Sequence, residues 1–577
     1  MSLQPQPWPQ IPELTVQAAR AAAGNGGYPL AMRVRDELGE LFADAEFAEA
    51  FGVRGKPGWS RGRLALVTVL QMAENLTDRG AAHQVRFRMD WKDALGMELS
   101  DPGFDHTVLS EFRGRVVTHG MEEKGLDLLL AALAEKGLVT AGGKQRTDST
   151  HVVAAVRDLN RLELAGESVR ACLEALAVAA PAWLAGAVDV AGWGKRYTAR
   201  GDSWRLPASQ AKRAELALAS GTDGFALLAA VYAADAPSWL AEVPAVGVLR
   251  VVLVQNYTRT VTGGREVVKR REAETDGLPP GRLRLTSPYD THARWGGKRD
   301  TFWNGYKVHV SETCDTPDST GTGSGSAASA RVAAEPPNLI TNVATTDATV
   351  PDSAMTEPIH RTLAARGLLP GERSIDSGYP SAELVLTSLR DFGIALISPV
   401  LLDTSPQARA GAGFDPTAFT IDWDAGSATC PQGAVSASWS PCVQRGADAV
   451  VVKFPAQVCQ ACPVRGQCTT ATRGGRQLTL RPREIQQALD TARAQQTTNA
   501  WQAKYALRAG VEGTIHQAVA VTDIRHARYK GLDKTHLEHV DAAVALNLTR
   551  LDAWWNGHPL DRTRTSHLAR LELALAA

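Results

Sequence analysis

The sequence predicts an α/β protein in which a mixed five-stranded sheet carries helices on both faces and follows an all-α N-terminal domain. Three observations support this class. Residues 31–140 repeat apolar side chains at three- and four-residue spacing, the period of amphipathic helices. Around residues 144–151 the period becomes strand-like, and short apolar strands then alternate with helical segments. The apolar fraction of 44% and the charged fraction of 21% are those of an ordinary globular protein.

The N-terminal part divides into two segments. Residues 1–30 are rich in Pro, Gln and Ala, and we expect them to be poorly ordered. Several short helices separated by polar turns follow over 31–140, with Arg113 and Arg115 on one flank. This pattern fits a helix-turn-helix-like DNA-binding domain, and it fits a helical cap domain with ordinary surface arginines equally well.

The order of the later elements predicts the topology of the sheet. Over 141–400 and 501–560, a strand with an acid is followed by two strands, a helix, a second strand with an acid, a helix, a strand and a final acidic helix. This is the order of a ribonuclease-H-like fold, in which a right-handed crossover brings the tips of the first and fourth strands together. We therefore expect Asp148 and Asp376 to meet, and the late helix to lay Glu512 against them.

Two insertions interrupt this core. Residues 152–285 read mostly as helix, and residues 401–500 are irregular and rich in cysteine. A Gly/Ser/Ala/Pro segment at 315–337 has the composition of a flexible linker. All three fall in connections between core elements, where long additions cost little free energy.

The chemistry is predicted by three short segments, TDST around Asp148, IDSGYP around Asp376 and RAGVEGTIHQ around Glu512. Glu512 follows Arg508 by one helical turn and Tyr505 by two. Two Mg²⁺ ions about 3.5–4 Å apart need carboxylates that converge from separate elements and leave positions open for substrate oxygens. Each acid alone reads as a surface residue or a cap. The ordered set predicts a metal-dependent site that acts on nucleic-acid strands.

Five of the seven cysteines lie within 430–468, which is not the pattern of a disulfide framework in a chain of this length. Three of them form a C-x₂-C-x₅-C motif, and another precedes a Pro-Gln-Gly turn. Thiolates at such spacing can hold a structural Zn²⁺ ion. The zinc candidates are Cys430, Cys459, Cys462 and Cys468, with Cys442 as a fifth. The alternative is a set of reduced, partly buried cysteines in an insertion domain.

Charge gives a mixed indication about nucleic acid. The 62 Lys and Arg residues balance the 62 Asp and Glu residues, which argues against a protein wrapped in nucleic acid. Cations nevertheless cluster at 525–530. On the expected second strand, Lys307 and His309 alternate beside the strand of Asp148, which predicts a DNA contact; ordinary exposed strand residues are the alternative.

Membrane and secretion signals are not evident. No uncharged apolar run reaches the roughly 18 residues of a membrane span. The first residues have neither the basic start nor the apolar core of a signal peptide. We therefore expect a cytoplasmic protein without a membrane partner.

Over about 35–555 the chain resembles the DDE transposases of bacterial insertion sequences, the group in which a helical DNA-binding domain precedes a ribonuclease-H-like core. TDSTHV, IDSGY and YALRAGVEGTIHQ resemble the first-aspartate, second-aspartate and glutamate motifs, and GYKVHV the second-strand motif. Related transposases carry Tyr, two residues, Arg, three residues, Glu, six residues and Lys. Tyr505, Arg508 and Glu512 fit this signature, but its lysine position is Val519. The candidates for the missing phosphate contact are Arg525, Arg528 and Lys530.

The resemblance implies cut-and-paste movement of a DNA element. Hydrolysis would expose a 3′-hydroxyl at each element end, and that hydroxyl would attack a target phosphodiester. It implies two Mg²⁺ or Mn²⁺ ions bridged by Asp148, with Asp376 and Glu512 holding one each. Arg508 would neutralise a phosphate or orient the carboxylate, and Tyr505 would lie near the scissile strand.

The same resemblance implies the partners. These are double-stranded DNA, as terminal inverted repeats and as target, and a second copy of the chain, because two element ends must be cut together. The protein would then be associated with the nucleoid when bound to DNA.

Two other functions also fit the sequence. A catalytically inactive, domesticated DNA-binding protein is favoured by Val519, although the intact set of acids argues against it. A different ribonuclease-H-like nuclease would cut without joining, and the N-terminal helical domain weighs against that function.

Overall fold

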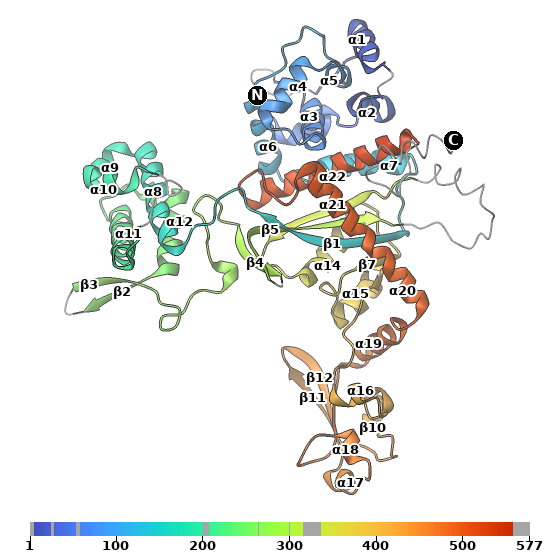
Figure 1. Ribbon diagram of the computed structural model, residues 1–577. Helices are drawn as coiled ribbons and strands as arrows, with labels where there is room; N and C mark the ends of the chain where they lie inside the picture. The colour runs from blue at the N-terminus through green and yellow to red at the C-terminus, as the bar shows by residue number, and fades with distance from the viewer. Residues whose placement is uncertain are drawn as a thin grey trace.

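The computed structural model describes residues 5–24, 28–52, 58–199, 207–262, 265–298, 300–314 and 336–557. A central α/β core carries an N-terminal helical domain, a lateral helical insertion and a small module that projects at the opposite end from the N-terminal helices (Figure 1). Of the linker predicted at 315–337, residues 315–335 lie outside the described residues.

The core is built on a six-stranded mixed sheet. Its strands are β1 (Lys144–Val153), β4 (Arg294–Lys298), β5 (Thr301–Thr313), β6 (Ile340–Asp347), β7 (Glu372–Ile375) and β8 (Ala395–Ile397). β1 pairs antiparallel with β5 and parallel with β7, and β7 pairs parallel with β8. β4 and β6 share the other edge of β5, because β5 is long enough to pair with both in turn.

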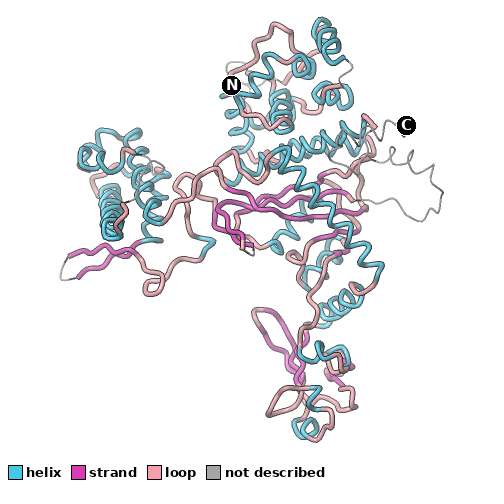
Figure 2. The backbone as a smooth tube through the Cα atoms, in the orientation of Figure 1, coloured by secondary structure: helices cyan, strands magenta, loops and turns pink. Residues whose placement is uncertain are grey.

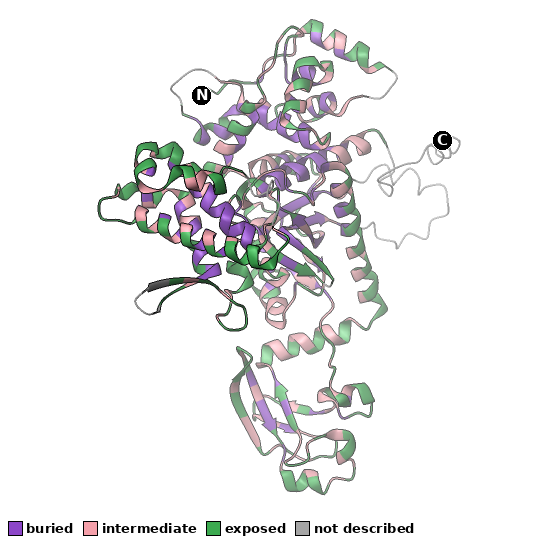
Figure 3. Cartoon of the chain, turned by 60° about the vertical axis from the view of Figure 1, so that its left-hand side comes forward, coloured by how far each residue is buried: buried purple, intermediate pink, exposed green. Residues whose placement is uncertain are grey.

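This topology confirms the predicted ribonuclease-H-like fold. The sixth strand, β4, was not expected; it forms a hairpin with the first half of β5. Helices α21 (Gly510–Thr522) and α22 (Leu532–Trp555) pack on one face of the sheet, and α14 (Thr356–Ala365) and α15 (Ala382–Phe392) lie on the other. α22 is buried along most of its length because it lies between the sheet and the N-terminal helices (Figure 3).

The N-terminal domain shares its hydrophobic core with the sheet. Its helices are α1 (Glu13–Ala23), α2 (Leu30–Leu38), α3 (Arg61–Ala73), α4 (Asp78–Phe87), α5 (Met89–Ala94), α6 (Thr107–Thr118) and α7 (Lys124–Glu135). Of these, α2, α3, α6 and α7 contact α22, and one cluster of buried apolar side chains runs through both parts. The domain is therefore held in place by apolar burial.

The expectation that residues 1–30 are poorly ordered is wrong for most of this segment. Trp8 is buried and donates its indole N–H to the carbonyl of Phe42 over 2.9 Å. Thr15 on α1 is buried and donates its hydroxyl to the carbonyl of Met97 over 2.8 Å. These long-range contacts outweigh a composition that resembles a loose terminus.

The lateral insertion forms a second hydrophobic core. It contains α8 (Arg161–Ala179), α9 (Pro181–Ala187), α10 (Val190–Tyr197), α11 (Gln210–Val231), α12 (Pro244–Asn256), β2 (Tyr257–Thr262) and β3 (Arg265–Arg270). Asn160 and Glu163 form a capping box that starts α8. By length and composition α11 could cross a membrane. Here it packs on α8 and α12, and Asp223 within it binds Arg196 and Tyr197.

The cysteine-rich segment folds as a small module around a three-stranded antiparallel sheet (Figure 2). Its elements are α16 (Pro406–Ala410), β9 (Thr420–Asp422), β10 (Ser427–Thr429), β11 (Ser438–Gln444), β12 (Ala447–Lys453), α17 (Ala456–Gln460), α18 (Arg465–Cys468) and β13 (Gln477–Leu480). Helices α19 (Arg483–Gln495) and α20 (Asn499–Ala506) lead back to the core.

Candidate active site

The sheet places Asp148 and Asp376 side by side. Thr147 on β1 is in register with Ile375 on β7. Asp148 and Asp376 are the next residues along these two parallel strands, so they lie beside each other. Asp148 is buried, and its Oδ1 accepts the backbone N–H of Ser149 over 2.8 Å. Asp376 is half-buried at the end of β7, and its Oδ1 accepts the N–H of Ser377 over 2.7 Å.

Glu512 reaches these strands from α21, and Arg508 connects it to Asp148. One guanidinium nitrogen of Arg508 lies 3.0 Å from Asp148 Oδ2, and another lies 2.9 Å from Glu512 Oε1. The side chain of Glu512 is 63% exposed, whereas that of Asp148 is 12% exposed. The acids therefore differ in environment, with one desolvated carboxylate and one open to solvent.

Electrostatics couple this cluster. Burial raises the pKa of Asp148 above its usual range, against the opposing effects of the Ser149 N–H and the Arg508 charge. Burial lowers the pKa of Arg508, but the negative charge of Asp148 outweighs it and the net shift is upward. Arg508 thus stays protonated and places a positive charge between two carboxylates.

Tyr505 lies against the same cluster with an aromatic partner. Its ring stacks on that of Trp501, with centroids 5.1 Å apart and planes 14° apart, and the Arg508 guanidinium lies 5.9 Å from the Tyr505 centroid. Both rings belong to α20, and a short 3₁₀ turn, Leu507–Ala509, separates them from α21. Trp501 was not singled out from the sequence, although its four-residue spacing from Tyr505 puts both on one helix face.

A buried acid below α21 was also missed. Glu312 on β5 is fully buried and lies 2.7 Å from Arg146 Nε and 2.8 Å from an Arg550 guanidinium nitrogen. Thr514 of α21 donates its hydroxyl to Glu312 over 2.6 Å, and Arg146 also donates to the carbonyl of Leu507. This network joins the sheet to the start of the helix that carries Glu512. The signal available in the sequence was an acidic residue within an apolar strand pattern. An acid that is buried in such a strand needs charged partners.

The expectation that His309 contacts DNA is wrong. His309 is fully buried, and its Nδ1 lies 2.6 Å from the Tyr379 hydroxyl. Burial lowers the pKa of His309 to about 4, so the ring is neutral at physiological pH. Lys307 is half-buried and pairs with Asp352 over 3.1 Å. Both side chains lie on the face of the sheet opposite the one on which the helix with Glu512 packs.

The basic candidates divide into structural and accessible groups. Arg113 is buried, pairs with Asp78 over 2.5 Å and packs on the Tyr529 ring, so the DNA contact expected of it is wrong. Arg115 pairs with Glu111 on its own helix. Arg528 donates to the carbonyl of Leu76 and ties the N-terminal domain to the core.

Two cations are better placed for a nucleic-acid strand. Arg525 is half-buried and donates from Nε to the hydroxyl of Thr150 over 2.9 Å. Thr150 follows Asp148 by two on β1, so both side chains lie on the same face of the sheet. Lys530 is exposed, and its ammonium lies 5.1 Å from the Tyr289 ring centroid.

Val519, which occupies the lysine position of the signature, packs against the main hydrophobic core. A lysine at this position of α21 would therefore have to direct its ammonium away from that core.

The donors of the acid cluster suit a hard divalent cation. Carboxylate oxygens are the ligands that Mg²⁺ and Mn²⁺ prefer, and three come here from three elements. The Arg508 guanidinium lies between two of them and balances part of their negative charge. Within the described ranges, however, no three His, Cys, Asp or Glu side chains are arranged closely enough to hold a metal ion.

Comparison with known proteins identifies two domains. The family model described as "Transposase DDE domain" matches residues 429–552, which include the five cysteines of the projecting module and α21. The model described as "Transposase domain (DUF772)" matches residues 31–115 in the N-terminal domain. No curated protein sequence and no solved structure matches the chain.

Proposed function

Because the chain belongs to the DDE transposases of the insertion-sequence type, an enzyme family that acts on DNA and depends on divalent metal, we propose that it cuts and joins DNA at the site of Asp148, Asp376 and Glu512. The observation that carries the proposal is that Arg508 connects Asp148 of β1 to Glu512 of α21, while Asp376 follows β7 beside Asp148. Arg508 and Asp148 are themselves 360 positions apart in sequence, so their contact joins distant parts of the fold.

The proposed reaction has two in-line phosphoryl transfers. In the first, water attacks the phosphorus at an element end and the 3′-oxygen leaves as a hydroxyl. In the second, that hydroxyl bonds to a target phosphorus and a target 3′-oxygen leaves. Mg²⁺ or Mn²⁺ ions held by the three acids would stabilise the attacking and leaving oxygens.

The remaining residues orient the DNA strand in this proposal. Arg508 holds Asp148 and Glu512 in fixed positions and contributes positive charge to the transferring phosphoryl group. The stacked rings of Trp501 and Tyr505 offer a face on which a base at the element end can pack. Arg525 binds the neighbouring phosphate in place of the lysine that Val519 replaces.

Element ends and target DNA are the proposed partners, with a dimer in the reacting complex and a cytoplasmic, nucleoid-associated location. Two ends must be cut together, so two active sites act in one assembly. The N-terminal domain, fixed on α22, would present its outer helices to the element end. This role is supported by the match to a transposase domain and by the packing of the N-terminal helices on α22.

The test is Mg²⁺-dependent cleavage of a labelled duplex that carries the flanking element end. Wild-type protein is compared with Glu512→Gln and Asp376→Asn, and binding of the same duplex is measured in Ca²⁺. We expect wild type to cleave at the end, and both variants to bind without cleaving. Cleavage by either variant at the wild-type rate would refute the assignment of that acid.

The domesticated DNA-binding protein is the second candidate, and the apolar packing of Val519 favours it. It predicts that wild type binds the element end but does not cleave it with Mg²⁺ or Mn²⁺. A nuclease that cuts but does not join predicts cleavage without strand-transfer product. The same gel resolves all three outcomes.

A further inference from the structure

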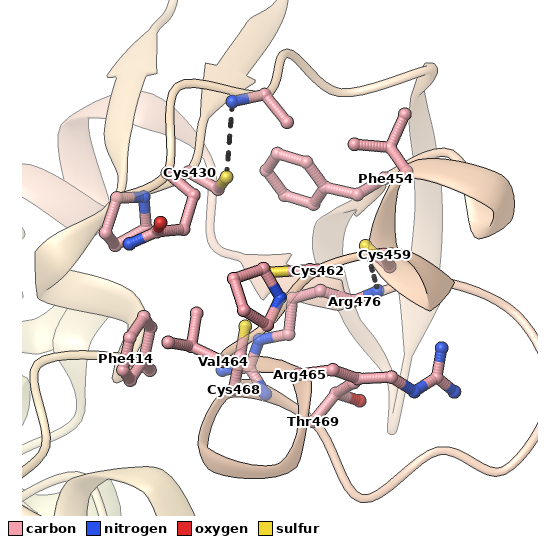
Figure 4. A pocket seen from close by; sticks show the side chains of 15 residues that line it. Phe414, Cys430, Phe454, Cys459, Cys462, Val464, Arg465, Cys468, Thr469 and Arg476 are labelled. Carbon is pink, nitrogen blue, oxygen red and sulfur yellow. Dashed lines mark hydrogen bonds between the residues drawn. The ribbon is translucent and has the colours of Figure 1, made fainter.

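Four cysteines of the projecting module face one cavity. Cys430 follows β10, Cys459 lies in α17, Cys462 in the next turn and Cys468 at the end of α18. Together they line a cavity of about 250 Å³ beside Phe414, Phe454 and Val464 (Figure 4). Cys442 lies on β11 in register with Ala449 and is not part of this lining.

Backbone donors already point at two of the sulfurs. The N–H of Ala434 lies 3.3 Å from Cys430 Sγ, and the N–H of Arg476 lies 3.4 Å from Cys459 Sγ (dashed in Figure 4). Gly475 allows the segment with Arg476 to approach Cys459, because a Cβ at Gly475 would lie 3.2 Å from Cys459 Sγ and 2.2 Å from the Phe454 carbonyl oxygen. Hydrogen bonds of this kind stabilise a thiolate and orient it as a metal ligand.

The module has little apolar material to hold it together. Residues 405–482 bury one small cluster of apolar side chains, namely Phe419, Ala428, Val452, Phe454, Leu478 and Leu480. Units of this size usually need a disulfide or a bound metal in addition to such a core. All five cysteines of the module are free, so no disulfide supplies that stabilisation.

We propose that Cys430, Cys459, Cys462 and Cys468 bind one structural Zn²⁺ ion that holds this module folded. An all-sulfur set of four suits tetrahedral zinc, and each thiol releases its proton on binding. The four sulfurs share a cavity but do not yet converge at ligand distance, so binding would draw α17 and α18 toward the turn after β10.

The ion would stabilise the module from which the chain continues to Arg508 and the helix that carries Glu512. At the neck of the module, the Val400 N–H donates to the side-chain oxygen of Gln496 over 3.0 Å, and the Gln496 side-chain nitrogen donates to the Val400 carbonyl over 3.2 Å. Arg481 pairs with Glu383 of α15 over 3.1 Å, and α19 packs on α15. The chain then continues through α20 to Arg508. Zinc thus fixes a module whose exit leads to the acid cluster, while the six-stranded sheet has a separate hydrophobic core of its own.

The test is the zinc content of full-length protein purified under reducing conditions without chelator. We expect about one zinc per chain for wild type and a loss of at least ten-fold for C459S/C462S. C442S is the matched control, since it removes a cysteine of the same module outside the cavity, and it should keep the metal. Wild type that fails to retain one equivalent of added Zn²⁺, or C442S that loses zinc as the double variant does, would overturn the proposal.

Two further readouts separate the metal from general misfolding and from catalysis. Co²⁺ in place of zinc should give the thiolate charge-transfer absorption of a four-sulfur tetrahedral site, and its absence would count against these ligands. Stripping zinc should speed proteolysis within 405–482 at least ten-fold and leave the core intact. D148N should lose DNA cleavage but keep zinc, so either proposal can fail without the other.

Discussion

Glu312→Gln tests whether the buried network below α21 fixes the position of Glu512. The Glu312 side chain is completely buried, and its partners Arg146 and Arg550 are 11% and 13% exposed. Glutamine keeps the shape of the side chain but carries no charge, so it leaves two largely buried guanidinium groups without their counter-ion. The hydroxyl of Thr514 also loses a charged acceptor.

The size of the effect follows from burial. Removing one partner of a buried ion pair costs about 3–5 kcal/mol, because the remaining charge stays desolvated. The retained amide oxygen can still accept one hydrogen bond, so we expect the lower end, about 3 kcal/mol. For a cooperative unit of about 150–250 residues this lowers the unfolding temperature by about 6–12 °C.

The assay is calorimetric unfolding of the full-length protein without DNA, combined with amide hydrogen exchange on α21. E312Q should lower the transition of the core and speed exchange over Gly510–Thr522. E274Q, at an exposed glutamate of the insertion, is the control and should change stability by less than about 0.5 kcal/mol. A core transition within about 1 °C of wild type would refute the reasoning, as would an E312Q/R550Q double variant whose effects simply add.

Three other perturbations test the site and its support. Arg508→Gln removes the cation shared by Asp148 and Glu512, and end cleavage should fall on the order of 10–100-fold with DNA binding retained, while Arg508→Lys recovers part of the rate. Gly510→Ala would place a Cβ 2.0 Å from the Arg146 guanidinium, so it should lower stability by about 1–3 kcal/mol in a thermal melt, and an unchanged melt would contradict this. Burial raises the pKa of Asp541 to about 7, so its contribution to stability is present at low pH and is lost as pH rises toward and through 7. Asp541→Asn should therefore unfold at a higher temperature than wild type at pH 8, and this advantage should disappear near pH 4.

Local patterns predicted the fold well. The change from helical to strand period around residues 144–151 and the order of the strands led to the ribonuclease-H-like topology, which the structure confirms. The hairpin strand β4 was not predicted, because its sequence, RWGGK, has too few apolar residues to show a strand pattern. The order of the segment around Trp8 was not predicted either. Composition reports only local tendency, whereas this segment is held by partners far along the chain.

The candidate site was less predictable than the fold. Motif spacing identified the acids and placed Arg508 one turn before Glu512, but the contact of Arg508 with Asp148 depends on β1 and α21 meeting in space. The expected DNA contacts of Arg113 and His309 failed for the same reason. Their burial is decided by Tyr529 and Tyr379, which a reading along the chain does not bring near them.

By itself the sequence determined most of the elements, their order, and which side chains are the candidates for the chemistry, because periodicity, turn residues and motif spacing are local properties of a chain. Only the tertiary structure decided which of these side chains meet. It connected Asp148 to Glu512 through Arg508, buried Glu312 among two arginines, and gathered four separated cysteines around one cavity. Burial and charge pairing depend on contacts between segments up to several hundred residues apart, and such contacts arise only when the sheet, its helices and the insertions pack together.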